Sequence, residues 1–524
     1  MNILLGLDLT NPDSRFLATS ASKTTTARIE VELSNEPTYT AVVEFLDRNV
    51  VKTLLLECVE RARDLISENK SPDRVAEAFM EHPEQRFRLK YILGNFTPVE
   101  NIRDEVTDDE EEQDRVGTIG NPEVDALIMA LYQDGTDEEI AERAFELISL
   151  KLAESPVGSA AWPHLVSFSA NNQKSFGNLI KVFTDNHYTR FGKLLTPLIK
   201  SIKMKGPFNP PGYGGGENPD WIFIDGEGLG HVTSTVAVPD TITSLLKEVD
   251  IILIIDNAAQ PLQHGTQALL RAIAPRGLLS KTRIVFTHFD QVRGSNLDTV
   301  TARRNHVISS LHNFLRGSKE YLCEEHVKEL REFVVEHAVF FSYVDDPKRS
   351  KNGINNQGLQ ALYTRFEHSP LIQPGVHDSV IKSFLQDKGI RDTIYNKAIP
   401  QFFENEYVNM HRSIWNQVKA LCTRFVKGTD IEYRHLRPIA NLQQRIAEMN
   451  FPLLLNLHGG DVELANLAAA KMDTQVRDVL TERLSRHYTQ EWRYSENLKG
   501  KGSHTVRVDS VDDIYKDAFT NIAL

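Results

Sequence analysis

Cysteine is scarce in this sequence, with only three in 524 residues: Cys58, Cys323 and Cys422. The three lie far apart and show none of the paired spacings that metal sites or disulfide frameworks use. The sequence therefore predicts reduced thiols in a cytoplasmic protein, not a disulfide-stabilised secreted domain.

Long hydrophobic runs are also missing. No apolar stretch approaches the roughly 18 residues that a membrane-spanning helix needs. The apolar start, MNILLGLDL, has neither the basic region nor the cleavage site of a signal peptide. Membrane contact is possible but is not indicated by the sequence.

Positive charge is in deficit, because 59 Lys and Arg face 72 Asp and Glu and leave a net charge of −13. An acidic chain is repelled by phosphate backbones, so nucleic acid is not an expected partner. With 41% hydrophobic and 25% charged residues, the composition is that of a globular protein, and its length suggests several domains.

The strongest positive pattern is a set of four apolar runs that each end in polar residues. They are Trp221–Ile224 before Asp225, Val249–Ile255 before Asp256, Arg283–Phe286 before Thr287, and Ala338–Phe341 before Ser342. Helix-length segments separate them, which is the rhythm of a parallel sheet with helices on its faces. Ligands bind at the carboxyl ends of such strands, so we expect Asp225, Asp290 and Ser342 at one sheet edge.

Elsewhere the sequence pattern predicts two further strands and is otherwise mainly helical. Residues 28–33 and 39–45 alternate like strands, with Glu36-Pro37 as the turn between them. Residues 1–8, 50–205 and the chain from about 374 onward show helical spacing of apolar residues.

Three short motifs follow the apolar strands in a fixed order along the chain. Asp225–Gly228 is a D-x-x-G motif, Thr287–Asp290 is a T-K-x-D-like motif with His288 in the lysine position, and Ser342-Tyr343-Val344 is a short serine loop. This order on strand ends resembles the P-loop GTPases, and the layout of the chain resembles their dynamin-like branch.

The resemblance implies a fold and a division of the chain. We expect an α/β, doubly wound GTPase-like sheet, a large helical insertion and a C-terminal helical region. Residues 1–48 would be the N-terminal part of the GTPase-like domain and 49–205 the insertion. Residues 206–373 would complete the domain, and 374–524 would form the helical domain.

The resemblance also implies roles for particular residues in binding Mg²⁺ and GTP. Asp225 would hold Mg²⁺ through water, the Gly228 N–H would meet the γ-phosphate, and Thr25 or Thr26 would close over the metal. Asp290 would read guanine, because a carboxylate accepts hydrogen bonds from both N1–H and the exocyclic amine. Thr287 and His288 belong to the same motif, with the imidazole stacking on the base, and Ser342 and Tyr343 would touch the base from below.

Two other functions fit part of the pattern. A pseudo-GTPase scaffold would keep the fold for partner binding, and an ATPase would use Asp225 and Glu227 as a paired acid with Glu227 activating water. Nucleotide-dependent self-association into a homo-oligomer follows from the family resemblance alone.

The phosphate loop G-x-x-x-x-G-K-[ST], whose N–H groups and lysine neutralise the phosphates, does not occur in the chain. In the resembled family, a helix continues past this loop in a pattern that Met1–Gly6 (MNILLG) matches. We therefore expect an upstream extension that encodes a strand and the loop. The chain as given would bind GTP weakly or not at all and would lack GTPase activity. Its sheet would have an unfilled position between the strands that end at Asp225 and Asp290.

Overall fold

The computed structural model describes residues 3–7, 27–81, 87–94, 121–133, 135–158, 161–214, 217–226, 238, 240–318, 322–344, 346, 348–367, 387–408, 418–427, 437–498 and 503–522. Contacts divide the chain into two compact units, residues 1–228 and 229–524.

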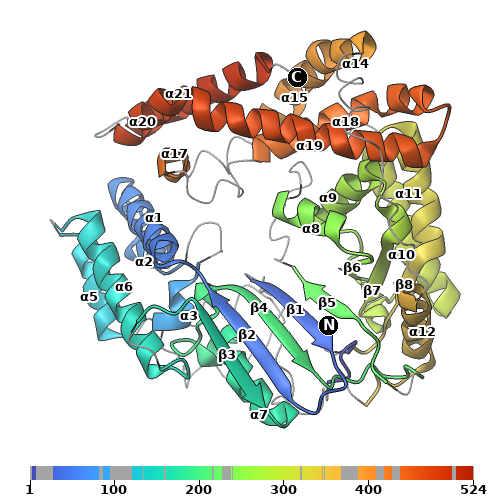
Figure 1. Ribbon diagram of the computed structural model, residues 1–524, viewed down its shortest axis with the longest axis horizontal. Helices are drawn as coiled ribbons and strands as arrows, with labels where there is room; N and C mark the ends of the chain where they lie inside the picture. Colours follow the sequence, from blue (N-terminus) through green and yellow to red (C-terminus); the bar gives the residue numbers. More distant parts are fainter. Residues whose placement is uncertain are drawn as a thin grey trace. The chain divides into compact units, whose positions relative to one another are not determined.

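The first unit contains a five-stranded mixed sheet with the order β3-β2-β4-β1-β5 (Figure 1). Its strands are β1 Arg28–Leu33, β2 Tyr39–Phe45, β3 Leu165–Ala170, β4 Ile199–Gly206 and β5 Ile222–Asp225. Strands β1 and β4 are parallel, and every other neighbouring pair is antiparallel. In β1 every second side chain is buried, as its alternation of apolar and charged residues predicts.

Helices complete the core of this unit. They are α1 Arg48–Ser67, α2 Pro72–Met80, α3 Leu89–Leu93, α5 Pro122–Leu131, α6 Asp137–Glu154 and α7 Gln173–Thr184, with short turns η2 Tyr188–Arg190 and η3 Thr196–Leu198. Helix α7 packs on β2 and β3, while α1 packs on α2 and α6. The helix α6 begins with a reciprocal cap between Thr136 and Glu139, which satisfies two otherwise unpaired N–H groups.

The second unit begins with the parallel sheet β6-β7-β8. Its strands are β6 Ile252–Asn257, β7 Thr282–Thr287 and β8 Ala338–Phe340. Around the sheet lie α8 Asp240–Glu248, α9 His264–Ile273, α10 Val300–Ser318, α11 Glu324–His337 and α12 Gly353–Glu367, with turns η4 Ala274–Arg276, η5 Leu279–Lys281 and η6 Phe289–Gln291. Helix α9 contacts β6, α11 contacts β7 and β8, and α12 contacts β8.

A helical region follows within the same unit. It contains α14 Lys388–Thr393, η7 Ile394–Ala398, α15 Ile399–Phe402, η8 Phe403–Tyr407, α17 Val418–Lys427, α18 Arg437–Leu457, α19 Val462–His487, α20 Thr489–Asn497 and α21 Ser503–Thr520. Gly459 and Gly460 adopt positive φ and end α18, so that α19 folds back along it. Both helices also contact η4 of the α/β part.

Several predictions need correction. The four apolar runs do form strands, but β5 is not in the parallel sheet; it pairs antiparallel with β1, with Asp225 opposite Ile29. Residues 28–33 and 39–45 are strands as predicted, and β4 lies between them in the sheet. Residues 49–205 are not purely helical, since they contain β3 and most of β4. At the N-terminus, Ile3–Gly6 form a turn instead of a helix. The predicted unfilled sheet position stays a prediction, because β5 and β7 belong to separate units.

Candidate functional site

The T-K-x-D-like motif forms a tight loop at the carboxyl end of β7. The Thr287 carbonyl accepts a hydrogen bond from the Ala258 N–H at 2.8 Å, and its hydroxyl donates to the Asp256 carbonyl at 3.1 Å. Phe289 is buried and packs against Phe340 of β8, with ring centroids 4.9 Å apart. The buried phenylalanine therefore anchors the loop, while the side chains on either side of it remain partly exposed.

The serine loop after β8 meets this loop directly. The Tyr343 N–H donates to Asp290 Oδ1 at 2.5 Å, and the Phe289 N–H donates to the Phe341 carbonyl at 3.0 Å. Two motifs that are 53 residues apart in the chain thus share a hydrogen bond at one sheet edge. The predicted proximity of Asp290 and the serine loop is confirmed, and it follows from parallel pairing of β7 with β8.

Both loops contain a non-glycine residue in the left-handed backbone region. His288 has φ 54° and Tyr343 has φ 53°. Such a conformation is uncommon for residues with a Cβ and costs on the order of 1–3 kcal/mol, which surrounding contacts must offset. Residues of this kind cluster at functional sites. The His288 ring lies partly exposed, with Nδ1 3.4 Å from Gln291 Nε2.

Asn355, which the sequence did not single out, fixes the serine loop. Its Oδ1 accepts from the Ser342 N–H at 2.8 Å, and its Nδ2 donates to the carbonyls of Ser342 at 2.9 Å and Ser350 at 2.6 Å. Asn355 lies in the first turn of α12, where its own N–H donates to Asn352 Oδ1. The local signal was the N-x-x-N spacing of a helix cap.

Asp256 at the end of β6 is a second residue that sequence reasoning left unassigned. Its two carboxylate oxygens accept from the N–H groups of Asn257 at 2.9 Å and of Leu262 at 2.6 Å. Leu262 has φ 59°, so Asp256 holds a strained turn beside the β7 loop. Burial raises the pKa of the Asp256 carboxyl above its ordinary value.

Of the remaining predicted site residues, only Asp225 is described. Asp225 ends β5 in the first unit, in register with Ile29. Thr25, Thr26 and Gly228 lie outside the described residues, as does Glu227 of the ATPase alternative. The structure therefore brings together Thr287, His288, Asp290, Ser342 and Tyr343 from the predicted set.

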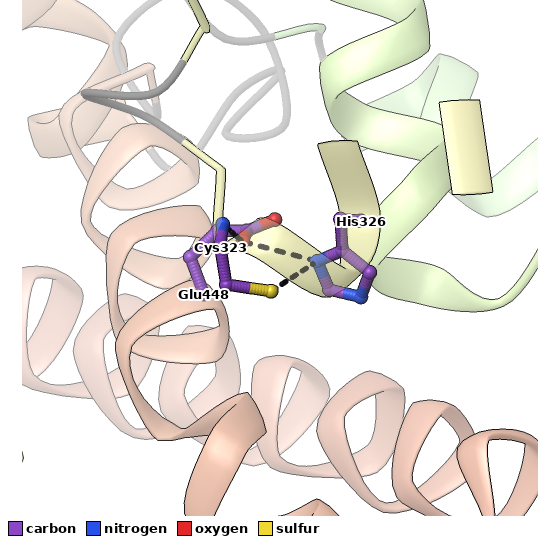
Figure 2. A group of neighbouring side chains, drawn as sticks. All are labelled: Cys323, His326 and Glu448. Atoms are coloured by element: carbon purple, nitrogen blue, oxygen red, sulfur yellow. Dashed lines mark hydrogen bonds and ion pairs between the residues drawn. The ribbon is translucent and has the colours of Figure 1, made fainter. Parts of the chain in front are cut away.

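A separate cluster of chemically active side chains lies where α11 meets α18 (Figure 2). Cys323 immediately precedes α11, and its Sγ lies 3.3 Å from His326 Nδ1. Glu448 Oε2, from α18, lies 3.1 Å from the same nitrogen and accepts a 3.1 Å hydrogen bond from the Cys323 N–H. Because the cysteines lack the paired spacing of metal ligands, the sequence predicted no metal site around them. That prediction missed this group, because Glu448 follows His326 by 122 residues.

The side chains of the cluster are mostly buried from solvent. His326 is fully buried and Glu448 is 4% exposed, while Cys323 is partly exposed. Burial raises the pKa of the Cys323 thiol. Burial by itself lowers the pKa of His326, but Glu448 and Cys323 outweigh it and hold that pKa well above its ordinary value. With His326 protonated, its 3.1 Å contact with Glu448 is a buried ion pair.

None of the described helices combines the length and the apolar character needed to cross a bilayer. Comparison of the chain with models of protein families and with curated proteins finds no match in either set.

Proposed function

We propose that the paired loops after β7 and β8 bind the base of a guanine nucleotide, within a dynamin-like, GTPase-related module. The observation that carries this proposal is the hydrogen bond from the Tyr343 N–H to Asp290 Oδ1 at 2.5 Å. It orients the carboxylate at the carboxyl end of a parallel sheet, where nucleotides bind in α/β folds.

The chemistry of the two loops suits guanine better than adenine. With Oδ1 fixed by one N–H, the second oxygen of Asp290 and the remaining lone pair of the first are able to accept two hydrogen bonds. Guanine offers two adjacent donors, N1–H and the exocyclic amine, whereas adenine presents an acceptor at N1. The partly exposed imidazole of His288 supplies a flat surface for stacking on the base.

The phosphates and Mg²⁺ have no assigned partners in the second unit. Among the predicted magnesium ligands only Asp225 is described, and it belongs to the first unit. The proposal therefore concerns base recognition, and no step of hydrolysis is derived from these residues.

The test compares the wild-type chain with Asp290→Asn by calorimetric titration with GDP, ADP and xanthosine diphosphate. We expect GDP to bind weakly but in preference to ADP. Hydrogen bonds to a charged acceptor contribute about 1.5–3 kcal/mol, so Asp290→Asn should weaken GDP binding roughly 10- to 100-fold. Xanthosine diphosphate, whose 2-oxo group replaces the amine, should become the better ligand of the variant.

The matched control is Asp298→Asn, which alters an exposed carboxylate in the segment that follows the β7 loop. It should leave the binding of all three nucleotides unchanged. Equal binding of GDP and ADP by the wild type would refute guanine recognition. Absence of binding by all three would instead favour a scaffold that keeps the fold without the ligand.

A further inference from the structure

Three different donor atoms converge in the cluster at the α11–α18 contact. Cys323 Sγ, His326 Nδ1 and a Glu448 carboxylate oxygen all lie within 4.8 Å of one another. The two distances to His326 Nδ1 are 3.3 Å from sulfur and 3.1 Å from oxygen. Ligands of a tetrahedral Zn²⁺, with bonds of about 2.0–2.3 Å, lie roughly 3.3–3.6 Å apart. The two distances to Nδ1 are already close to this spacing, whereas the sulfur and the carboxylate oxygen, within 4.8 Å of each other, would move together around the ion.

Within the described part of the chain, one atom of the cluster has no hydrogen-bond partner. Glu448 Oε1 is buried and unpaired among the described residues, on a side chain that is only 4% exposed. A buried carboxylate oxygen without a partner costs about 1–3 kcal/mol or more. Neither the thiol nor the imidazole, as arranged, relieves that cost, because both contacts of the carboxylate use Oε2.

The other nitrogen of His326 is already oriented. Nε2 lies 3.3 Å from Asn466 Oδ1, of α19, and an amide oxygen only accepts hydrogen bonds. Nε2 therefore carries a proton, and in the neutral ring the lone pair is on Nδ1, facing the sulfur and the carboxylate. An outer hydrogen bond that fixes the tautomer in this way accompanies most histidine ligands of metals.

We propose that Cys323, His326 and Glu448 bind a transition-metal ion, with Zn²⁺ as the best match and water in the fourth position. A thiolate, an imidazole and a carboxylate form a donor set that zinc accepts and that Mg²⁺ or Ca²⁺ would not select. Cys323 is the one ligand of the three that is partly exposed, so the ion and the water would enter on its side.

The ion would join two parts of the second unit. Cys323 and His326 belong to the α/β part, and Glu448 and Asn466 belong to the C-terminal hairpin of α18 and α19. Metal binding would thus tie the hairpin to α11 more firmly than the ion pair does. This inference does not depend on nucleotide binding.

The first experiment measures metal content and affinity on the full chain. After removal of metal with a chelator, reloading with excess Zn²⁺ and dialysis of the unbound metal, we expect about one Zn²⁺ per chain by elemental analysis. Co²⁺ should give the near-ultraviolet charge-transfer band of a cobalt–thiolate bond. Cys323→Ser should abolish that band, while the matched control Cys422→Ser, a buried thiol of the same unit, should retain it.

A second variant separates metal binding from folding. Asn466→Ala leaves all three ligands in place and should weaken Zn²⁺ binding about 10- to 100-fold, the usual effect of losing an outer-shell partner. Circular dichroism should confirm that each variant is folded. Absence of stoichiometric Zn²⁺ or Co²⁺ binding by the wild type would overturn the proposal, as would an unchanged cobalt spectrum in folded Cys323→Ser. Either result would show that the cluster is only a buried ion pair beside a thiol.

Discussion

The amide of Asn355 holds the loop that carries Ser342 and Tyr343, so replacing it tests how this half of the proposed nucleotide site is built. Asn355→Ala removes three hydrogen bonds, to the Ser342 N–H and to the carbonyls of Ser342 and Ser350. Asn355 is 4% exposed and Ser342 is 3% exposed, so water does not easily replace those partners. At about 0.5–1.5 kcal/mol for each net hydrogen bond, the loss is about 2–4 kcal/mol.

Hydrogen–deuterium exchange measures this loss at individual amides. It suits this chain better than global unfolding does, because a chain of two units need not unfold in a single transition. A loss of about 2–4 kcal/mol should accelerate exchange of the Ser342 amide roughly 30- to 1,000-fold. Exchange of the Tyr343 amide, which is hydrogen-bonded to Asp290, should also accelerate because the same loop opens. Asn356→Ala is the matched control, since it changes an exposed neighbour on the same helix. Equal protection of Ser342 in the two variants would refute the view that Asn355 clamps the loop.

Two further predictions concern stability. Because burial raises the pKa of Asp256, the folded chain binds that proton more tightly than the unfolded chain does. The contribution of Asp256 to stability therefore falls as pH rises from the unfolded value, about 3.9, through the raised folded one. Asp256→Asn should remove this dependence in thermal unfolding measured across pH; a wild-type-minus-variant difference that does not change with pH would contradict it. Gly277→Ala should destabilise by about 2–4 kcal/mol, because φ is 65° and the added Cβ would lie 2.7 Å from Asn466 Cβ. Gly317→Ala, in α10 with open space around it, should instead stabilise slightly in the same thermal assay, and equal effects of the two changes would show that the contact at Gly277 is soft.

The sequence predicted the second unit better than the first. Strands β6, β7 and β8 are apolar runs that end in polar residues, and parallel pairing alone then brings Asp290 to Tyr343. Asn355 and Asp256 escaped notice because their roles depend on backbone groups in loops, which leave no periodic pattern. Glu448 carries no local signal at all, and the C-x-x-H spacing of Cys323 and His326, which the sequence-based prediction did not use, is the one local trace of the cluster.

The first unit was harder for two physical reasons. Strand β4 has three lysines among its eight residues, and its buried positions do not alternate regularly, so it does not show the period of a half-buried strand. Strand β3 alternates, but it lies at the edge of the sheet and none of its side chains is fully buried. Edge strands need little hydrophobic character, and both strands lie in a segment where helical spacing dominates.

The position of β4 between β1 and β2 has a consequence for how this protein is made. On the ribosome, β1 and β2 emerge before β4 and do not pair with each other. Glu44 of β2 pairs with Lys200, which is translated 156 residues later. At roughly 5–20 residues per second, translation leaves the two strands without their shared neighbour for about 8–30 s. Unpaired strand edges attract other chains during such delays. Nascent chains of this protein should therefore depend on chaperones until Gly206 has left the exit tunnel.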